Sequence, residues 1–233
     1  IAAGGSGSLV SSSGGVAAAP AKSEPVAKSE IQKPAENRDR ERRADVPGKP
    51  LSAYQSIYTD KQEYKELISE TEQGFAKGLT TAQRHSLGYY KGSGYGSINR
   101  SLRKGTSPAS YDQKHIDNLD SALSKSTLGK DLVLYRGFTA DIKHEIGKTY
   151  TDHGFMSTSL NPNRAFGGNI FLKIHAPSTV KGAFIEAKRV YNKTAAKGSI
   201  HGLAEHEVLL ARGTSYKVIK KGKILSKGIE KEV

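Results

Sequence analysis

Two glutamates, Glu205 and Glu207, lie two residues apart at the head of the apolar run "EHEVLLA". In a β-strand, residues i and i+2 point to the same side of the sheet, so a strand here would aim both carboxylates at one place. Paired charges also occur at solvated strand edges, where they discourage unwanted strand pairing. The choice between a chemical task and a solvated edge depends on the polar residues of the other predicted strands.

Two more predicted strands each carry an isolated polar residue among apolar neighbours. Arg136 lies in "LVLYRGF", and Ser157 lies in "FMSTSL". An arginine in a strand is commonly a surface charge, and Ser-Thr-Ser is common in strand edges and turns. Each residue alone is therefore a weak signal, and the information lies in their order along the chain.

This order resembles the Arg-Ser-Glu class of mono-ADP-ribosyltransferase toxins, which is related to the actin-modifying bacterial toxins. The class has an aromatic-Arg-Gly strand, an aromatic-x-Ser-Thr-Ser strand, and a Glu-x-Glu pair that leads into an apolar strand. The corresponding segments here are 135–137, 155–159 and 205–210, and the resemblance covers about residues 55–225. It implies an α+β fold in which an N-terminal helical layer packs on a two-sheet, mainly antiparallel β core.

Two further segments fit the same class. "NRAFGGNIFLKIHAP" stands where the class has a loop with a nicotinamide-contacting phenylalanine, here Phe166. "GYGSINRSLRKG" is similar to its helix with Ile-Asn-x-x-Leu-Arg, here with Asn99 and Arg103. The resemblance implies NAD as a substrate. The candidate NAD-binding residues are Arg136, Gly137, Phe166, Asn99, Arg103 and Thr158.

The reaction of this class cleaves the bond between nicotinamide and ribose in NAD and passes ADP-ribose to a protein side chain. Such a bond breaks through an oxocarbenium-like transition state, which a nearby carboxylate stabilises, and Glu207 is the candidate. Ser157 would hydrogen-bond Glu207 and fix its rotamer. Arg136 would hold the diphosphate of NAD, because a guanidinium fork matches phosphate oxygens. Thr158 would brace its strand rather than react.

The resemblance also gives Glu205 a task. An acceptor arginine is protonated at neutral pH, so it needs a carboxylate that orients it and takes up a proton during attack. Glutamate at this first position is associated with arginine acceptors in the class. The catalytic candidates are therefore Glu207, Glu205 and Ser157. No metal is expected, since the chemistry requires none and the histidines show no metal-ligand spacing.

Hydrophobic periodicity predicts a helical layer ahead of the strands. Helices are expected at 58–75, 79–90, 94–105 and 111–125. The first would begin with a capping box of Thr59 and Gln62. The third would bury a stripe of Tyr95, Ile98 and Leu102.

Short runs rich in β-branched and aromatic residues predict the strands. They are expected at 132–138, 154–160, 169–177, 182–187, 205–211 and 215–221. Helices followed by strands are typical of the α+β class. "GSGYG" at 92–96 lacks the setting of a dinucleotide-binding fingerprint and is interpreted as a turn. The polar segment 187–204 is interpreted as the loop that presents the acceptor protein.

Residues 1–52 differ in composition from the rest of the chain. They are rich in Gly, Ser, Ala, Pro and mixed charge and contain no aromatic residue, which predicts a disordered linker or delivery segment. A catalytic domain is expected at 53–233. No run is long enough for a signal h-region or a membrane span. Because the chain begins with isoleucine, we expect a processed product or a fragment.

The net charge of +13 lies mostly after residue 50 and favours a phosphate-bearing or acidic partner. The absence of cysteine excludes disulfides and thiolate chemistry. Two alternatives to ADP-ribose transfer stay open. One is an NAD glycohydrolase with water as the acceptor. The other is a basic nucleic-acid-binding module, although aromatic residues are not interleaved with the basic ones.

The expected partner is a target protein with an acceptor arginine. Actin is the first candidate by resemblance, while RNA polymerase, small GTPases and bacterial division proteins stay open. The expected setting is a bacterial or phage effector that is secreted or injected and acts in the cytoplasm of a target cell.

Overall fold

The structure, a computed structural model, describes residues 49–187, 190–191 and 205–233. These residues belong to one compact unit, Pro47–Val233. Nearly all of the predicted linker, and most of the acceptor loop predicted at 187–204, lie outside the described residues. The domain boundary at residue 53 therefore stays a prediction.

The first half of the described chain is helical, which confirms the predicted helical layer. The elements are η2 (Leu51–Ala53), α1 (Lys61–Gln73), α2 (Thr81–Tyr89), η3 (Tyr90–Gly94), α3 (Tyr95–Lys104) and α4 (Ser110–Ser124). Ile116, Leu119 and Leu123 of α4 are buried at the spacing of one helical face.

The capping box lies on a different helix from the predicted one. Helix α1 begins after Asp60, whose Oδ1 accepts a hydrogen bond of 2.8 Å from the backbone N–H of Gln62. Thr59 is one residue too early to cap this helix, so the predicted box is wrong there, since aspartate caps as well as threonine. A capping box is found at α2, between Thr80 and Gln83.

A π-helical segment, η3, joins α2 directly to α3. The prediction of a turn at 92–96 is therefore wrong. A Cβ added at Gly94 would lie 2.3 Å from Cε1 of Tyr89, so the glycine makes room for this ring and the helical path continues. Segments of π-helix often lie at functional sites, and the first two residues of η3 reach the site described below.

Nine strands follow in the described residues, and every pairing of one of these strands with another is antiparallel. The strands are β1 (Leu132–Phe138), β2 (Thr149–Asp152), β3 (Met156–Ser159), β4 (Ile170–Ala176), β5 (Gly182–Phe184), β6 (Glu207–Leu210), β7 (Thr214–Lys217), β8 (Lys223–Ser226) and β9 (Ile229–Glu232). The main sheet has the order β4-β1-β3-β6-β5, and β2–β7 and β8–β9 form two smaller sheets. This arrangement confirms the α+β class.

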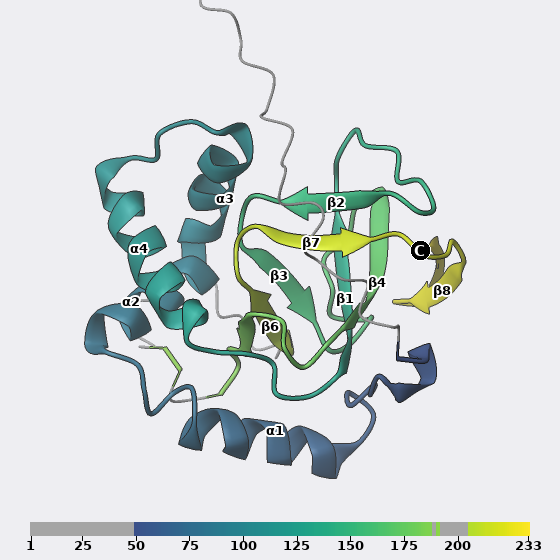
Figure 1. Cartoon of the computed structure of the whole chain (residues 1–233), viewed down its shortest axis with the longest axis horizontal. Coiled ribbons are helices and arrows are strands. Elements are labelled where there is room, and N and C mark those ends of the chain that lie inside the picture. The colour runs from purple at the N-terminus through teal and green to yellow at the C-terminus, as the bar shows by residue number, and fades with distance from the viewer. Residues whose placement is uncertain (1–48, 188–189, 192–204) are drawn as a thin grey trace, which may run out of the picture. The chain divides into compact units, whose positions relative to one another are not determined.

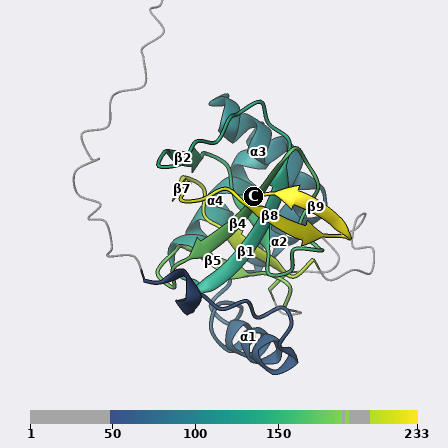
Figure 2. The same ribbon diagram turned by 90° about the vertical axis from the view of Figure 1, so that its right-hand side faces the viewer.

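The helices cover the sheets from two directions. Figure 1 shows α2, α3 and α4 grouped beside the main sheet and α1 running below it. In the turned view of Figure 2 the same three helices lie behind the sheet, and the β8–β9 hairpin lies in front. One core cluster joins Ile98 and Leu119 of the helices to Leu209 of β6, and a second joins Leu67 of α1 to Leu134 of β1. The central strands are thereby fixed from both directions.

Among the described residues, no helix is both long and apolar enough to cross a membrane.

Candidate active site

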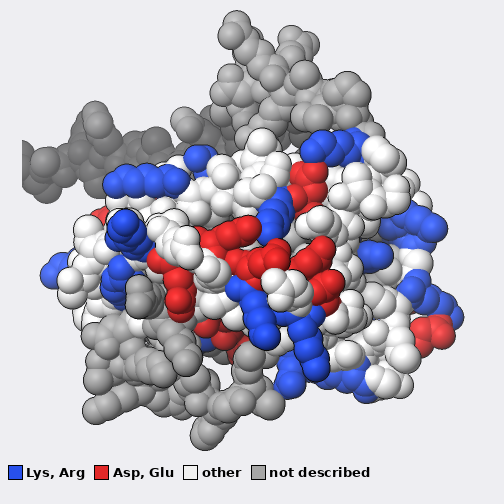
Figure 3. All heavy atoms as spheres, turned by 90° about the horizontal axis from the view of Figure 1, so that it is seen from below, with Lys and Arg blue, Asp and Glu red and all other residues white. Residues whose placement is uncertain are grey.

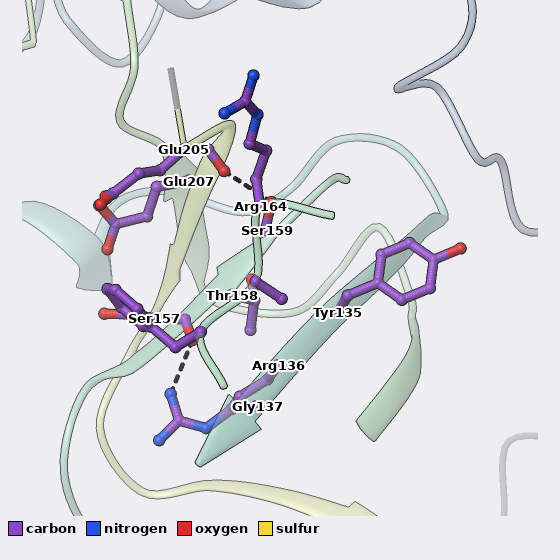
Figure 4. Close-up of a pocket in the computed structure, with 11 residues that line it drawn as sticks. Tyr135, Arg136, Gly137, Ser157, Thr158, Ser159, Arg164, Glu205 and Glu207 are labelled. Atoms are coloured by element: carbon purple, nitrogen blue, oxygen red, sulfur yellow. Dashed lines mark hydrogen bonds between the residues drawn. The ribbon is translucent and has the colours of Figure 1, made fainter. Parts of the chain in front are cut away.

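One pocket gathers most of the predicted site residues (Figure 4). Its walls come from β1, β3, the loop after β3, and the start of β6. The predicted residues in its lining are Arg136, Gly137, Ser157, Thr158, Phe166, Glu205 and Glu207. The lining does not include Asn99 or Arg103, which lie on α3.

The strand order explains why three distant segments meet here. Strand β3 lies between β1 and β6, with Tyr135 paired to Ser159 and Ser159 paired to Glu207. Arg136, Ser157 and Glu207 therefore sit on three adjacent central strands. Figure 4 shows Ser157 between the side chains of Arg136 and Glu207.

The two glutamates converge for a different reason from the predicted one. Strand β6 begins at Glu207, so Glu205 lies before the strand and not on its face. The intervening His206 has a φ of 52°, and its ring stacks on Tyr64 at 4.7 Å between ring centroids. Ser159 Oγ donates to the carbonyl oxygen of Glu205 at 2.6 Å. The prediction of a regular i, i+2 strand pair is therefore wrong, although both side chains do line the pocket.

A lysine that the sequence analysis missed lies among the carboxylates. Nζ of Lys91, from η3, is 2.7 Å from Oε1 of Glu186, 3.0 Å from Oε2 of Glu205 and 3.2 Å from Oε2 of Glu207. The three carboxylates have oxygens within 4.8 Å of one another. The ammonium group of Lys91 lies among them in this structure. Glu186 follows β5 and was missed because a single glutamate at a strand end gives no signal.

Burial raises the pKa of Glu207 above its ordinary value, and Lys91 opposes this rise by Coulombic attraction and a hydrogen bond. Burial would lower the pKa of Lys91, but the nearby carboxylates of Glu207 and Glu186 raise it overall. Lys91 is therefore a protonated ammonium group. Ser157 also lowers the pKa of Glu207, by less than Lys91 does.

Arg136 is buried at the other end of the pocket. Its Nη1 donates to the carbonyl oxygen of Ser157 at 2.7 Å, and its Nη2 donates to Oδ2 of Asp152 at 3.1 Å. Arg103 donates to the same carboxylate through Nε at 2.8 Å. Two guanidinium groups thus share one aspartate. Asp152 was missed because its strand, β2, is short and polar and was not predicted.

Asn99 positions groups behind the pocket wall. Its Nδ2 donates to Oη of Tyr90 at 2.8 Å, and its Oδ1 accepts from the backbone N–H of Phe155 at 2.8 Å. The Tyr90 hydroxyl in turn lies 3.0 Å from Oγ of Ser157. Burial raises the pKa of Tyr90 to about 12, so it is a neutral phenol. Asn99 and Tyr90 therefore hold β3 at Ser157.

The side chain of Thr158 connects two strands of the main sheet, which is the kind of bracing predicted for it. The side chain is buried, and Oγ1 donates to the carbonyl oxygen of Val208 at 2.6 Å. This bond ties β3 to β6 next to Glu207.

Phe166 lies at the mouth of the pocket, on the loop after β3. Its side chain is 52% exposed and stacks on Tyr95 at 6.4 Å between ring centroids. Tyr95 is itself 47% exposed, so its predicted place in the buried stripe of α3 is wrong, while Ile98 is fully buried. Tyr95 is the first residue of α3, and its ring lies against Phe166.

Gly137 lets the Phe166 loop cross β1. A Cβ added at Gly137 would lie 1.9 Å from the carbonyl oxygen of Phe166, which is a backbone atom that cannot rotate away.

We expect Gly137→Ala to displace this loop and to lower the free energy of unfolding by about 1–3 kcal/mol, the range for overpacking. Denaturant unfolding measures the change. Gly96→Ala is the matched control, because nothing lies within 4 Å of a Cβ added at that helical position. It should stabilise the protein slightly, since alanine favours helix over glycine. Equal stability of the two variants would contradict the close approach at Gly137.

The α+β fold and the placement of arginine, serine and glutamate on three adjacent strands are those of the Arg-Ser-Glu class of ADP-ribosyltransferases. The chain belongs to the ADP-ribosyltransferase exoenzyme family, whose model matches residues 61–233. It is therefore an NAD-dependent ADP-ribosyltransferase. A comparison with curated protein sequences found no match.

Several solved structures share this fold. The C3 exoenzyme of Clostridium limosum superposes with a TM-score of 0.60 at 17% identity, over 78% of this chain and 97% of that chain. C3stau2 from S. aureus, solved with NAD, gives 0.59 at 20% identity, over 74% and 93%. Exoenzyme S from Pseudomonas aeruginosa, solved in complex with human 14-3-3 protein beta and bound to Carba-NAD, gives 0.51 at 22% identity, over 76% and 82%.

Proposed function

We propose that this protein transfers ADP-ribose from NAD to an arginine of a target protein, with Glu207 serving the donor and Glu205 serving the acceptor. The observation that carries the proposal is that both carboxylates line the same pocket as Arg136 and Phe166. One pocket thus offers an anionic end for the reacting sugar and a guanidinium for the phosphates.

Glu207 suits the bond-breaking step. When the bond between C1 of the ribose and the nicotinamide nitrogen breaks, its electron pair leaves with nicotinamide and the ribose becomes an oxocarbenium ion. A carboxylate fixed beside C1 stabilises this charge without reorganising. Glu207 is almost fully buried and is held by Lys91, so its charge is fixed in place before NAD binds.

Glu205 suits the acceptor step. Its side chain is 41% exposed, so a guanidinium that enters from solvent can reach it. As a guanidinium nitrogen forms its bond to C1, the acceptor must lose one proton, and a carboxylate at hydrogen-bond distance can take it. The difference in exposure between the two glutamates supports this division of tasks.

Arg136 suits the diphosphate of NAD. Among the described residues, its hydrogen bonds to Ser157 and Asp152 use two of the five N–H donors of a guanidinium. Those bonds fix its plane, and the remaining donors can pair with phosphate oxygens. Arg103, which shares Asp152, would add positive charge at this end. Phe166, exposed at the mouth, offers a ring face for the nicotinamide.

We expect Arg136→Lys to raise the KM for NAD about tenfold or more, because a lysine cannot reproduce the bidentate pairing of a guanidinium. Nicotinamide release at varied NAD concentration measures the effect. Arg212→Lys is the matched control: Arg212 also pairs with a carboxylate, that of Asp120, but it lies outside the pocket lining. An unchanged KM in Arg136→Lys would mean that Arg136 has only a structural role.

Transfer is tested by incubating the protein with NAD and cell lysate and locating the adducts by mass spectrometry. ADP-ribose on arginine side chains of a lysate protein is the expected result. Adducts confined to other side chains would reject the arginine acceptor. Nicotinamide release without any adduct, and unaffected by lysate, would favour the NAD glycohydrolase. The target stays open, with actin as the first to test and RNA polymerase, small GTPases and bacterial division proteins to follow.

One face of the molecule carries acidic side chains at its centre. On the face seen in Figure 3, Asp and Glu side chains gather in the middle, with Lys and Arg around them. Helix α1, which lies on this side, carries Glu63, Glu66, Glu70 and Glu72. The described residues on this face therefore form no continuous basic stripe (Figure 3). Retention on DNA or RNA at varied salt concentration tests the nucleic-acid-binding alternative, which requires a steep salt dependence.

The proposed function also includes how the protein reaches its target. We infer a secreted or injected effector that acts in the cytoplasm of a target cell, where NAD and a protein target are both present.

A further inference from the structure

Lys91 forms ion pairs with Glu186, Glu205 and Glu207, and Glu186 holds it in place. Its shortest contact, 2.7 Å, is with Glu186, which follows β5. The side chains of Lys91 and Glu186 are 7% and 10% exposed, so both charges are withdrawn from water. Lys91 itself projects from η3, where the π-helical turn departs from the regular helix. One buried ion pair, formed between the helical layer and the sheet, thus reaches the pocket.

Glu207 needs a cation nearby. Its side chain is 8% exposed, and an isolated carboxylate at such a site favours its protonated form. Glu186 and Glu205, on either side, are both acids and add to this tendency when ionised. Among the described residues, Lys91 is the one cation that forms an ion pair with Glu207.

The other polar groups around this cluster do not replace Lys91. Arg136 and Arg164 also line the pocket, but among the described residues neither forms an ion pair with Glu207, and Arg136 pairs with Asp152. Tyr90 and Tyr191 face Glu207, and burial raises the pKa of both phenols, so they are neutral. Tyr64 faces Glu186 and Lys91, and its pKa is raised to about 12. Ser157 donates only a hydroxyl. His206 faces Glu186, and burial lowers its pKa, which makes it neutral near pH 7.

We propose that Lys91 is a positioning residue of the reaction: anchored by Glu186, its ammonium group holds the carboxylate of Glu207 at the pocket and keeps it ionised. This inference rests on the proposed role of Glu207. Lys91 is not itself the acceptor, because a protonated amine has no free electron pair for attack on C1 of the ribose.

The pH profile of NAD cleavage tests this role. In Lys91→Met, Glu207 loses its partner, so the acid limb of kcat for nicotinamide release should move up by about 1–3 pH units, the shift that one close opposite charge produces. At a pH below both limbs the rate should fall about tenfold for each pH unit of the shift, and it should recover as the pH rises. Lys91→Arg, which keeps the charge, should keep the acid limb close to that of the wild type. A residue with a merely structural role would lower the rate by the same factor at every pH.

Lys130→Met is the matched control, because Lys130 pairs with Glu70 outside the pocket lining and should leave the profile unchanged. An unchanged acid limb in Lys91→Met, a uniform loss across the pH range, or a faster reaction would each overturn the proposal. The last result would make Lys91 an internal blocker of the site. If Lys91→Met does not fold, Lys91→Gln decides, since its amide can still form a hydrogen bond in place of the ammonium group but carries no charge, and it should move the limb in the same direction.

Glu207→Gln separates this inference from the proposed function. If Glu207→Gln keeps wild-type NAD cleavage, the proposed role of Glu207 fails. If Glu207→Gln is inactive while Lys91→Met has the wild-type profile, only the role of Lys91 fails.

Discussion

Replacing Glu207 by alanine should lower the rates of NAD cleavage and of ADP-ribose transfer together, by a factor on the order of 10²–10³ or more. Both reactions are proposed to pass through the same oxocarbenium-like state, and Glu207 is the buried carboxylate proposed to stabilise it. NAD binding should be largely unaffected, because Arg136 and Phe166 stay in place. Nicotinamide release, transfer of labelled ADP-ribose and calorimetric titration with NAD measure the three quantities.

Glu207→Gln is the isosteric companion to this variant and should be equally inactive. It should unfold at a temperature no lower than the wild type. Burial raises the pKa of Glu207 in the folded protein. The free energy of unfolding therefore falls as the pH rises above the ordinary pKa of a glutamate, because the folded protein resists ionisation of this side chain. A neutral amide at this position removes that loss. Wild-type turnover in either variant would reject the assignment of Glu207.

Replacing Glu205 by alanine should abolish transfer while NAD cleavage by water stays near the wild-type rate. Glu205 is proposed to orient the acceptor guanidinium and to take its proton, and loss of a positioned general base lowers a rate by about 10²–10⁴-fold. The released nicotinamide and the labelled target protein are quantified in the same reaction, so that the ratio of the two rates is measured directly.

Glu66→Ala provides the control for this variant. Glu66 is exposed on α1, where it accepts a hydrogen bond from Gln62, and it is not in the pocket lining. Equal loss of cleavage and transfer in Glu205→Ala would remove the division of tasks between the two glutamates.

The strands of the site could be predicted because each combines an apolar run with one conspicuous polar residue. Arg136 in "LVLYRGF" and Glu207 before "VLL" are examples, and their strands are confirmed as neighbours of β3 in the main sheet. Apolar periodicity predicted the helices for the same reason, since Ile98 and Leu119 face the core they help to form.

The other features of the site could not be predicted, because they depend on contacts between residues that are distant in sequence or on local backbone geometry. Asp152 binds Arg136 and Arg103 from a short polar strand whose pairing with β7 is not encoded locally. Lys91 reaches the glutamates because "GSGYG" continues a helix as a π-turn, where glycines would ordinarily predict a turn. The convergence of Glu205 with Glu207 depends on the positive φ of His206, which a simple strand pattern cannot predict.

A crystal structure with a carba analogue of NAD, which resists cleavage between the sugar and nicotinamide, tests whether Arg136 and Glu207 bind the two ends of the same NAD molecule. We expect the diphosphate at hydrogen-bond distance from the guanidinium of Arg136 and the nicotinamide ribose against the carboxylate of Glu207. An analogue bound outside this pocket, or with its ribose turned away from Glu207, would contradict the account.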